Sequence, residues 1–152
     1  MAHNEIHVDV PPAAVFEVLA DPRLYGNWVV GASTTRSVEG RWPEAGATLH
    51  HVQAFFLHDT TTVLVCEPER RLVLEARARP IVIAEVDIRL APEGDGTRVT
   101  LDEVAKGGLL GALPKPVSDA LLYVRNIETM RRLKRLAEIG HALGRAEALG
   151  HA

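Results

Sequence analysis

VSDALLYVRNIETMRRLKRLAEI, residues 117–139, has the spacing of one long amphipathic helix. It follows a run of strand-like segments that ends near Val104. A sheet accompanied by a single long helix can bury its apolar face by curving around that helix, and this shape tends to leave an apolar space between the two. The order of the segments therefore predicts an α+β protein in which a curved antiparallel sheet wraps a long C-terminal helix.

The strands are separated by turn signals along the chain. Ile6, Val8 and Val10 alternate with polar neighbours, which is typical of a half-buried first strand. A short helical stretch follows, and turn residues such as His58-Asp59 then separate segments rich in β-branched residues. Because the links are short, consecutive strands must be antiparallel. We expect about seven strands, the other six at residues 34–38, 48–57, 60–67, 71–79, 81–91 and 97–104.

Composition limits the class of protein. The 152 residues are 47% hydrophobic and 24% charged, which suits one domain at residues 1–140 and a tail or helix extension at residues 141–152. The net charge of -3 argues against the broad basic surface that nucleic acid requires. A single cysteine, Cys66, permits no internal disulfide. No stretch approaches the length of a membrane span, so we expect a cytoplasmic protein without stable membrane insertion.

Four short motifs occur in a fixed order: VFEVLADP at 15–22 with Trp28 soon after, PERRL at 68–72, GTRVT at 96–100 and RNIE at 125–128. Together they resemble the START-like, polyketide cyclase/dehydrase superfamily (SRPBCC) over nearly the whole chain. The resemblance implies the helix-grip fold, with short helices between strands one and two. That superfamily includes aromatic polyketide cyclases, lipid and hormone binders and co-chaperones, so the fold alone does not assign an activity.

The adjacent histidines are the first candidates for acid-base chemistry. Neighbouring residues of a strand point to opposite faces, so only one of His50 and His51 can look inward. If Leu49 and Phe55 face the core, His51 and Gln53 enter the cavity; in the opposite phase His50 does. An inward imidazole could shuttle protons, or it could be a core histidine with a satisfied hydrogen bond.

Three more polar residues fall on predicted inner faces. Glu103 shares a strand face with Leu101, where it could act as an acid or base unless a bulge turns it outward. Asn126 lies on the apolar side of the long helix, where its amide either ties the helix to a neighbour or meets a ligand. Tyr123 on the same side could offer a hydroxyl to the cavity or simply fill volume.

Such a cavity predicts one function, and the resemblance suggests two alternatives. We expect a binder of a hydrophobic or aromatic small molecule, lipid-like or polyketide-like. The alternative is a polyketide cyclase, aromatase or dehydratase with an inward His or Glu as the acid or base. A co-chaperone-like interaction module with a filled core is the second alternative. The expected ligand-binding residues are Gln53, Phe55, Leu72, Leu74, Val86, Ile88, Tyr123, Asn126, Met130 and Leu133.

The sequence has no pattern typical of a metal or nucleotide site. It contains no His-Glu-x-x-His, Cys-x-x-Cys or Gly-x-Ser-x-Gly motif. The glycine-rich segment 107–111 lacks the strand and helix context of a dinucleotide loop, and we interpret it as a cavity lid. No metal or cofactor is therefore expected. Open sheet edges leave a homodimer as a possible assembly.

Overall fold

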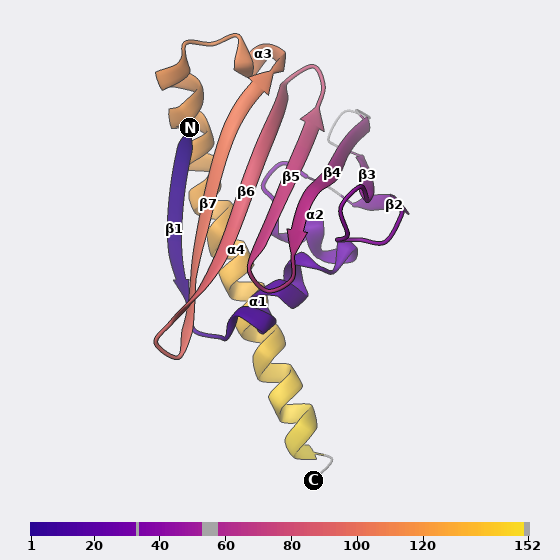
Figure 1. Cartoon of the computed structure of the whole chain (residues 1–152), viewed down its shortest axis with the longest axis vertical. Coiled ribbons are helices and arrows are strands. Elements are labelled where there is room, and N and C mark those ends of the chain that lie inside the picture. The colour runs from indigo at the N-terminus through magenta and orange to yellow at the C-terminus, as the bar shows by residue number, and fades with distance from the viewer. Residues whose placement is uncertain (33, 53–57, 151–152) are drawn as a thin grey trace.

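A curved sheet wraps one long helix (Figure 1). The computed structural model describes residues 1–32, 34–52 and 58–150. Its strands are β1 (Ala2–Val8), β2 (Thr35–Glu39), β3 (Thr48–Val52), β4 (His58–Glu67), β5 (Arg71–Ala78), β6 (Val82–Glu93) and β7 (Gly96–Gly107). Its helices are α1 (Pro12–Leu19), η1 (Pro22–Leu24), α2 (Tyr25–Trp28), α3 (Gly108–Gly111) and α4 (Lys115–Gly150). The predicted α+β class and the helix-grip fold are confirmed.

The described residues form one antiparallel sheet with the strand order β1-β7-β6-β5-β4-β3-β2. Strands β2 to β7 are neighbours in chain order, as short links require. β1 pairs with β7, with Val8 opposite Thr97 and Ala2 opposite Glu103, so the first and last strands of the chain meet in one ladder. The predicted inner face is also confirmed, because Leu72, Leu74, Ile88 and Leu101 are all buried.

Several strand ends differ from the prediction, and two of the differences have a clear physical reason. β1 stops at Val8, and Val10 is buried in the connection to α1, where its carbonyl accepts a hydrogen bond of 2.7 Å from Thr97 Oγ1. The two prolines that follow Val10 cannot donate to a strand ladder. The expected turn at His58-Asp59 belongs instead to β4, since Asp59 pairs with His51 across the sheet. Pairing with β3 therefore overrides a weak turn signal.

The turn between β6 and β7 is tight, and the end of β1 lies beside it. Gly94 has φ +58°, a left-handed conformation that favours glycine. At Gly96 a Cβ atom would lie 2.3 Å from the carbonyl oxygen of Val8. A side chain at this position would push β1 away from β7, so glycine allows the first strand to join the sheet.

The short helices close one end of the sheet. Pro12 stands in the first turn of α1, where a missing N–H costs nothing. Val15 and Leu19 form its buried stripe. Both α1 and α2 pack against α4, and Trp28 of α2 is almost fully buried in the shared core. These contacts fix the distance between the sheet and the long helix at that end.

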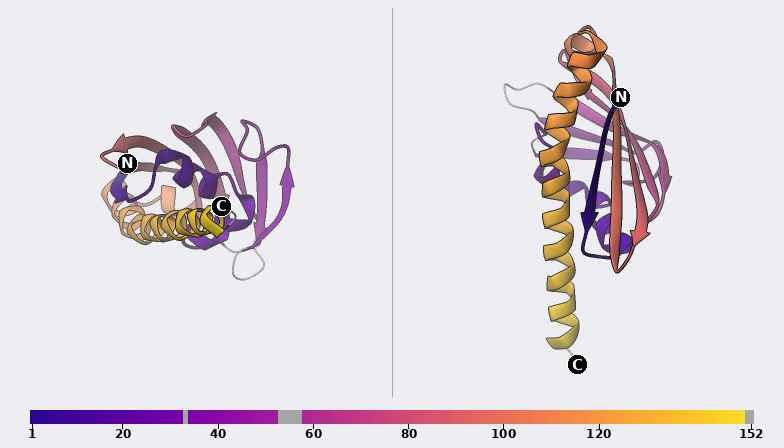
Figure 2. Two further views of the ribbon diagram at one scale, coloured as in Figure 1. Left: turned by 90° about the horizontal axis from the view of Figure 1, so that it is seen from below. Right: turned by 90° about the vertical axis from the view of Figure 1, so that its left-hand side faces the viewer.

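Helix α4 is longer than the predicted 117–139 and projects beyond the sheet (Figure 2). Its buried side recurs every three or four residues and consists of Ser118, Leu122, Asn126, Thr129, Met130, Leu133 and Ala137. Tyr123 was expected on this side, but it is 47% exposed. One residue rotates the helix by about 100°, which turns Tyr123 away from the sheet. Most side chains between residues 141 and 150 are exposed.

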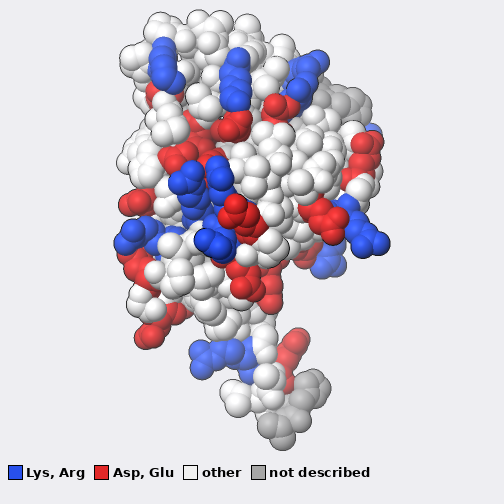
Figure 3. Space-filling model, in the orientation of Figure 1, with Lys and Arg blue, Asp and Glu red and all other residues white. Residues whose placement is uncertain are grey.

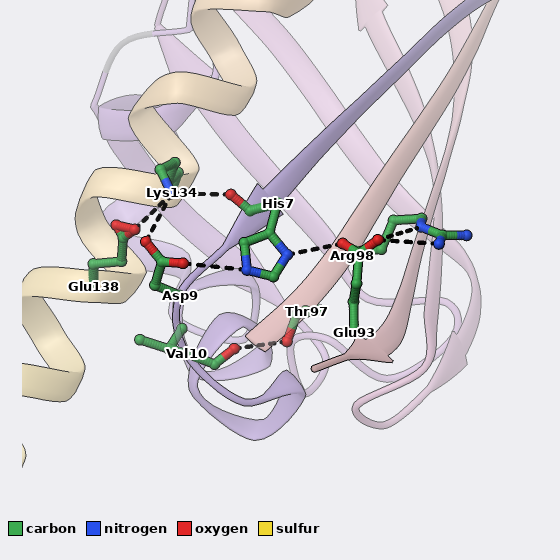
Figure 4. A network of polar contacts seen from close by, with 8 residues as sticks. All are labelled: His7, Asp9, Val10, Glu93, Thr97, Arg98, Lys134 and Glu138. Atoms are coloured by element: carbon green, nitrogen blue, oxygen red, sulfur yellow. Dashed lines mark hydrogen bonds and ion pairs between the residues drawn. The ribbon is translucent and has the colours of Figure 1, made fainter. Parts of the chain in front are cut away.

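A polar network fastens β1 to α4 and to the β6–β7 hairpin (Figure 4). Lys134 Nζ donates to the carbonyl of His7 at 2.9 Å and pairs with Glu138 at 2.7 Å. The imidazole of His7 lies 3.2 Å from Asp9 and 2.8 Å from Glu93. Groups from β1, α4 and β6 therefore meet at one place and hold the first strand against the helix.

The outer face of the sheet carries paired charges of both signs (Figure 3). Arg71 makes two hydrogen bonds to Asp87, of 3.1 and 2.9 Å, and Arg89 makes another at 3.1 Å. Lys106 pairs with Glu85 on the same face. Burial opposes ionisation of Asp87, but the two arginines outweigh it and lower the pKa of this carboxyl.

Among the described helices, none is long and apolar enough to cross a membrane.

Candidate functional site

A cavity of about 260 Å³ lies between the inner face of the sheet, α2 and the first half of α4. Most of its wall is apolar. The apolar lining consists of Val29, Val30, Ala32, Ala76, Ala78, Ile81, Val82, Ala84, Leu110 and Leu122, and the polar lining of Tyr25, His51, Asp59, Thr60, Thr61, Arg77, Glu103 and Arg125. Leu110 reaches the cavity from α3, whose backbone N–H at Leu110 donates to the carbonyl of Ile81 at 2.8 Å.

Three polar side chains form a chain of hydrogen bonds on one wall. The hydroxyl of Tyr25 lies 2.9 Å from Thr61 Oγ1, and Thr61 Oγ1 lies 2.9 Å from His51 Nε2. The rings of Tyr25 and His51 also stack, with centroids 4.6 Å apart and planes 12° apart. All three residues are at least 95% buried. The stack and the hydrogen bonds therefore fix the orientation of the His51 imidazole.

Asp59 lies directly across the ladder from His51. Opposite residues in an antiparallel pair share a face, so both side chains line the cavity. His51 Nδ1 and Asp59 Oδ1 are buried and have no hydrogen-bond partner among the described residues. Two unpaired polar atoms thus adjoin an otherwise apolar space.

A second polar group joins β7 to α4. The side-chain amide of Asn126 donates to Glu103 Oε2 at 2.6 Å, and Arg125 Nη1 lies 3.2 Å from the same oxygen. Arg125 Nε also donates to the carbonyl of Val30 at 2.9 Å. Glu103 is 3% exposed, and a buried carboxylate needs this kind of pairing. The cluster therefore anchors the helix to the sheet beside the cavity.

A smaller chamber of about 30 Å³ adjoins this cluster and shares Glu103 and Arg125 with the main cavity. Trp28 and Asn126 line it too, and Trp28 Nε1 is buried without a partner among the described residues. A chamber of this volume has room for one water molecule, which would accept from the indole N–H. The polar cluster therefore borders both the main cavity and the smaller chamber.

Burial alters the protonation of the cavity groups. It lowers the pKa of His51 to about 4, with a smaller contribution from the nearby His50, so the imidazole is neutral at pH 7. It raises the pKa of Asp59 to about 6. It also raises the pKa of the Tyr25 hydroxyl to about 12. One wall thus holds a neutral base, a carboxyl that titrates near neutrality and a phenol that remains protonated.

Comparison with known proteins identifies the family. Residues 2–138 match the family described as polyketide cyclase / dehydrase and lipid transport. The chain belongs to this family. No curated protein matches the chain.

Several solved structures share the fold of this family member. Protein CV1439 from Chromobacterium violaceum is 18% identical with a TM-score of 0.66, covering 90% of this chain and 95% of its own. Ara h 8.0201 is 11% identical with a TM-score of 0.68, covering 89% and 95%. DynU16, a protein of the dynemicin biosynthetic locus, is 21% identical with a TM-score of 0.67 over 91% of this chain and 47% of its own.

The two candidate histidines of this family member face opposite sides of the sheet. His51 is 2% exposed and lines the cavity. The His50 side chain is 38% exposed and lies on the outer face, 3.1 Å from Glu39. Glu103 points inward as its strand phase predicts, and Asn126 ties α4 to that carboxylate. A catalytic role for any of them stays a prediction.

The expected wall residues are distributed over several places. Leu74 and Val86 line the smaller chamber. Leu72, Ile88, Met130 and Leu133 are buried in the core and are absent from the lining of the main cavity. Tyr123 lies on the outer side of α4, beside a surface groove next to β1. Gln53 and Phe55 lie outside the described residues.

Sequence reasoning missed four polar residues of the site. Asp59 was assigned to a turn, although Asp59, Thr61 and Val63 alternate as one strand face. Arg125 was named only as part of a motif, yet its position beside Asn126 was a usable signal. Tyr25 belongs to none of the motifs or strand faces singled out in the sequence. Its approach to Thr61, 36 positions away, had no signal in the sequence.

The arrangement suits recognition and proton transfer. The described residues contain no group of three His, Cys, Asp or Glu side chains that could hold a metal ion. They do contain a neutral imidazole, a carboxyl and a phenol around an apolar space. Such a site can bind an apolar body and make hydrogen bonds to a polar group on it.

Proposed function

We propose that this protein binds a hydrophobic or aromatic small molecule, lipid-like or polyketide-like, in the cavity between the sheet and α4. The observation that supports it most is the cavity itself, about 260 Å³ with a mainly apolar wall and a few convergent polar groups. This combination is typical of small-molecule sites. Membership of the polyketide cyclase / dehydrase and lipid transport family agrees with it.

The volume limits the size of the ligand. Pockets for drug-sized molecules range from about 300 to 1,000 Å³, and this cavity is slightly smaller. A compact ligand of two or three rings, or a short acyl chain, suits it better than a full phospholipid. The cavity also favours ligand binding over a co-chaperone-like module, which was expected to have a filled core.

Native mass spectrometry of the purified protein tests the proposal directly. The protein is expected to retain a small apolar species that organic extraction releases and identifies. Ala76→Phe, which introduces a ring into the cavity wall, should abolish retention. Ala91→Phe, on the exposed face of β6, is the matched control and should retain the species. An unliganded mass, with no uptake from a panel of aromatic and lipid compounds, would contradict the proposal.

One observation favours a second candidate, a polyketide cyclase, aromatase or dehydratase. A neutral His51 beside Asp59, whose pKa burial raises to about 6, is a suitable pair for proton transfer near neutral pH. Asp59, the stronger base of the two, would remove a proton from carbon next to a ketone, and the His51 imidazole, as a hydrogen-bond donor, and the Arg125 guanidinium would stabilise the enolate oxygen.

Incubation of the retained species with the protein tests this second candidate. Conversion that is lost in His51→Ala and kept in His50→Ala would support it, because the two histidines differ in facing the cavity. Glu103→Ala serves as a further variant, provided that its melting temperature shows a folded protein. A retained species that is unchanged after incubation would support a carrier without enzymatic activity.

A further inference from the structure

The polar wall of the cavity offers one hydrogen-bond donor and one acceptor side by side. His51 Nδ1 and Asp59 Oδ1 are buried without partners among the residues that the structure describes. They belong to directly paired residues of β3 and β4, whose Cβ atoms are typically about 4.5–5.5 Å apart. Both side chains line the cavity from paired positions, so one small ligand group placed between them would meet both.

The hydrogen-bond chain assigns the proton on His51. The only described partner of the Tyr25 hydroxyl is Thr61 Oγ1, so Tyr25 donates to Thr61. Thr61 then donates its own hydrogen to His51 Nε2. A neutral imidazole carries one proton, which must be on Nδ1 when Nε2 accepts. The reverse order would leave the Tyr25 hydrogen and His51 Nδ1 both unpaired, whereas this order leaves only the Nδ1–H.

Asp59 differs from the ionisable groups Glu103 and Arg77, which also line the cavity, because each of those has a partner of opposite charge. Glu103 is paired with Arg125, and Arg77 is paired with Glu75 on its own strand. Asp59 has no ion pair among the described residues. The cavity therefore presents one uncompensated carboxylate, which disfavours an anionic ligand.

We propose that the cavity selects a neutral ligand with a hydroxyl group on an apolar body, and that this hydroxyl accepts from His51 Nδ1–H and donates to Asp59. The inference rests on the proposed function and specifies the polar group of its ligand. A phenol, an enol or an alcohol satisfies both atoms. A carboxylate satisfies only His51 and meets the charge of Asp59.

Three probes with the same naphthalene body test the selection at pH 7.5 by isothermal titration calorimetry on the full chain. 2-Naphthol is expected to bind at least about tenfold more tightly than 2-methylnaphthalene, because it adds a hydrogen bond to a charged group. 2-Naphthoate should bind most weakly. Equal binding of the naphthol and the methyl compound, or tightest binding of the naphthoate, would overturn the inference and leave the container function intact. Failure of all three would overturn both.

Two variants locate the interaction. Asp59→Asn removes the charge and adds an N–H donor, so naphthoate affinity should rise about tenfold, while Asp95→Asn in the exposed β6–β7 turn should change nothing. His51→Phe retains a ring against Tyr25 but removes the donor, and should weaken naphthol binding severalfold, because only the hydrogen bond to Asp59 remains. His50→Phe on the outer face is its control. Unchanged selectivity in folded Asp59→Asn and His51→Phe would also overturn the inference.

Discussion

His50 and His51 are neighbours in the chain with different surroundings. His50 lies on the outer face near Glu39, whereas His51 is buried, stacked on Tyr25 and bonded to Thr61. Burial lowers the pKa of His51 to about 4, so its imidazole stays neutral in the folded protein over most of the physiological range. In the unfolded chain the same group protonates near its ordinary value of 6.5. The difference makes stability depend on pH.

We expect His51→Gln to remove an acid-dependent loss of stability. A lowered folded pKa means that the unfolded state binds the proton more tightly, so His51 destabilises the fold as pH falls from about 6.5 towards 4. The advantage of the wild type over His51→Gln should therefore shrink by about 2 kcal/mol between pH 7 and pH 5. Urea unfolding at several pH values measures this difference.

His50→Gln is the matched control for this prediction and should show no such trend. Asp59 has the opposite sign, because its raised folded pKa of about 6 gives a contribution that is greatest at low pH and is lost as pH rises from about 4 to 6. The comparison must therefore be made between variants at each pH. A constant difference between wild type and His51→Gln would show that the imidazole is not buried as described.

Two regions differ in how closely their elements pack. The β6–β7 turn is packed against the end of β1, whereas the C-terminal end of α4 is mostly exposed. β1 pairs alongside β7 and ends beside Gly96, where its Val8 carbonyl occupies the space of a side chain. Helix α4 passes the end of the sheet and continues to Gly150 with mostly exposed residues. The packing at Gly96 holds β1 against β7, whereas the described end of α4 makes no contacts with the core.

Gly96→Ala should destabilise the protein by about 2 kcal/mol or more, because the new Cβ would lie 2.3 Å from backbone oxygen that cannot move aside cheaply. Gly140→Ala is the opposite case. Nothing lies within 4 Å of its added Cβ, and alanine in a helix interior is favoured over glycine by about 0.8–1.0 kcal/mol. Thermal unfolding of both variants measures the contrast. Equal melting temperatures would contradict the described approach of β1.

Removal of residues 141–152 should leave the fold intact. Residues 141–150 are mostly exposed, and the last fully buried side chain of α4 is Ala137. Segments without core contacts contribute little to global stability, so the melting temperature should change by less than about 2 °C. Probe binding should also be unchanged. A large drop, or a change in the mass measured by light scattering, would show that this end of the helix contacts another copy.

The whole molecule combines a packed core with an apolar cavity. The core lies between α1, α2, the sheet and the middle of α4, and the cavity lies further toward α3. An apolar cavity has fewer packing contacts than a filled core, which costs stability. The fold therefore keeps at its α3 end a space that a ligand can fill.

Filling that space should stabilise the protein. Ala76→Phe is expected to increase the free energy of unfolding by about 0.5–2 kcal/mol without ligand, the range of cavity-filling substitutions. The same variant should lose the melting-temperature increase that 2-naphthol gives the wild type, since a ligand that binds only the folded state stabilises it by mass action. Ala91→Phe, on the exposed face, should keep the ligand response. Destabilisation by Ala76→Phe with retained binding would place the ligand elsewhere.

The sequence alone determined the architecture and the faces of the elements. Alternation placed Leu72, Leu74 and Glu103 on the inner side, and helical spacing placed Asn126 on the buried side of α4, because both periods are local properties of the chain. The family resemblance came from motifs in order and was confirmed.

The composition of the site depends on contacts between segments that are far apart in the chain. The segment after His51 is apolar on both strand faces, so periodicity could not choose between His50 and His51, and pairing with β4 did. Tyr25 meets Thr61 across 36 positions, and Asn126 meets Glu103 across 23. Contacts of this kind depend on how a curved sheet closes on a helix, and no local pattern encodes that distance.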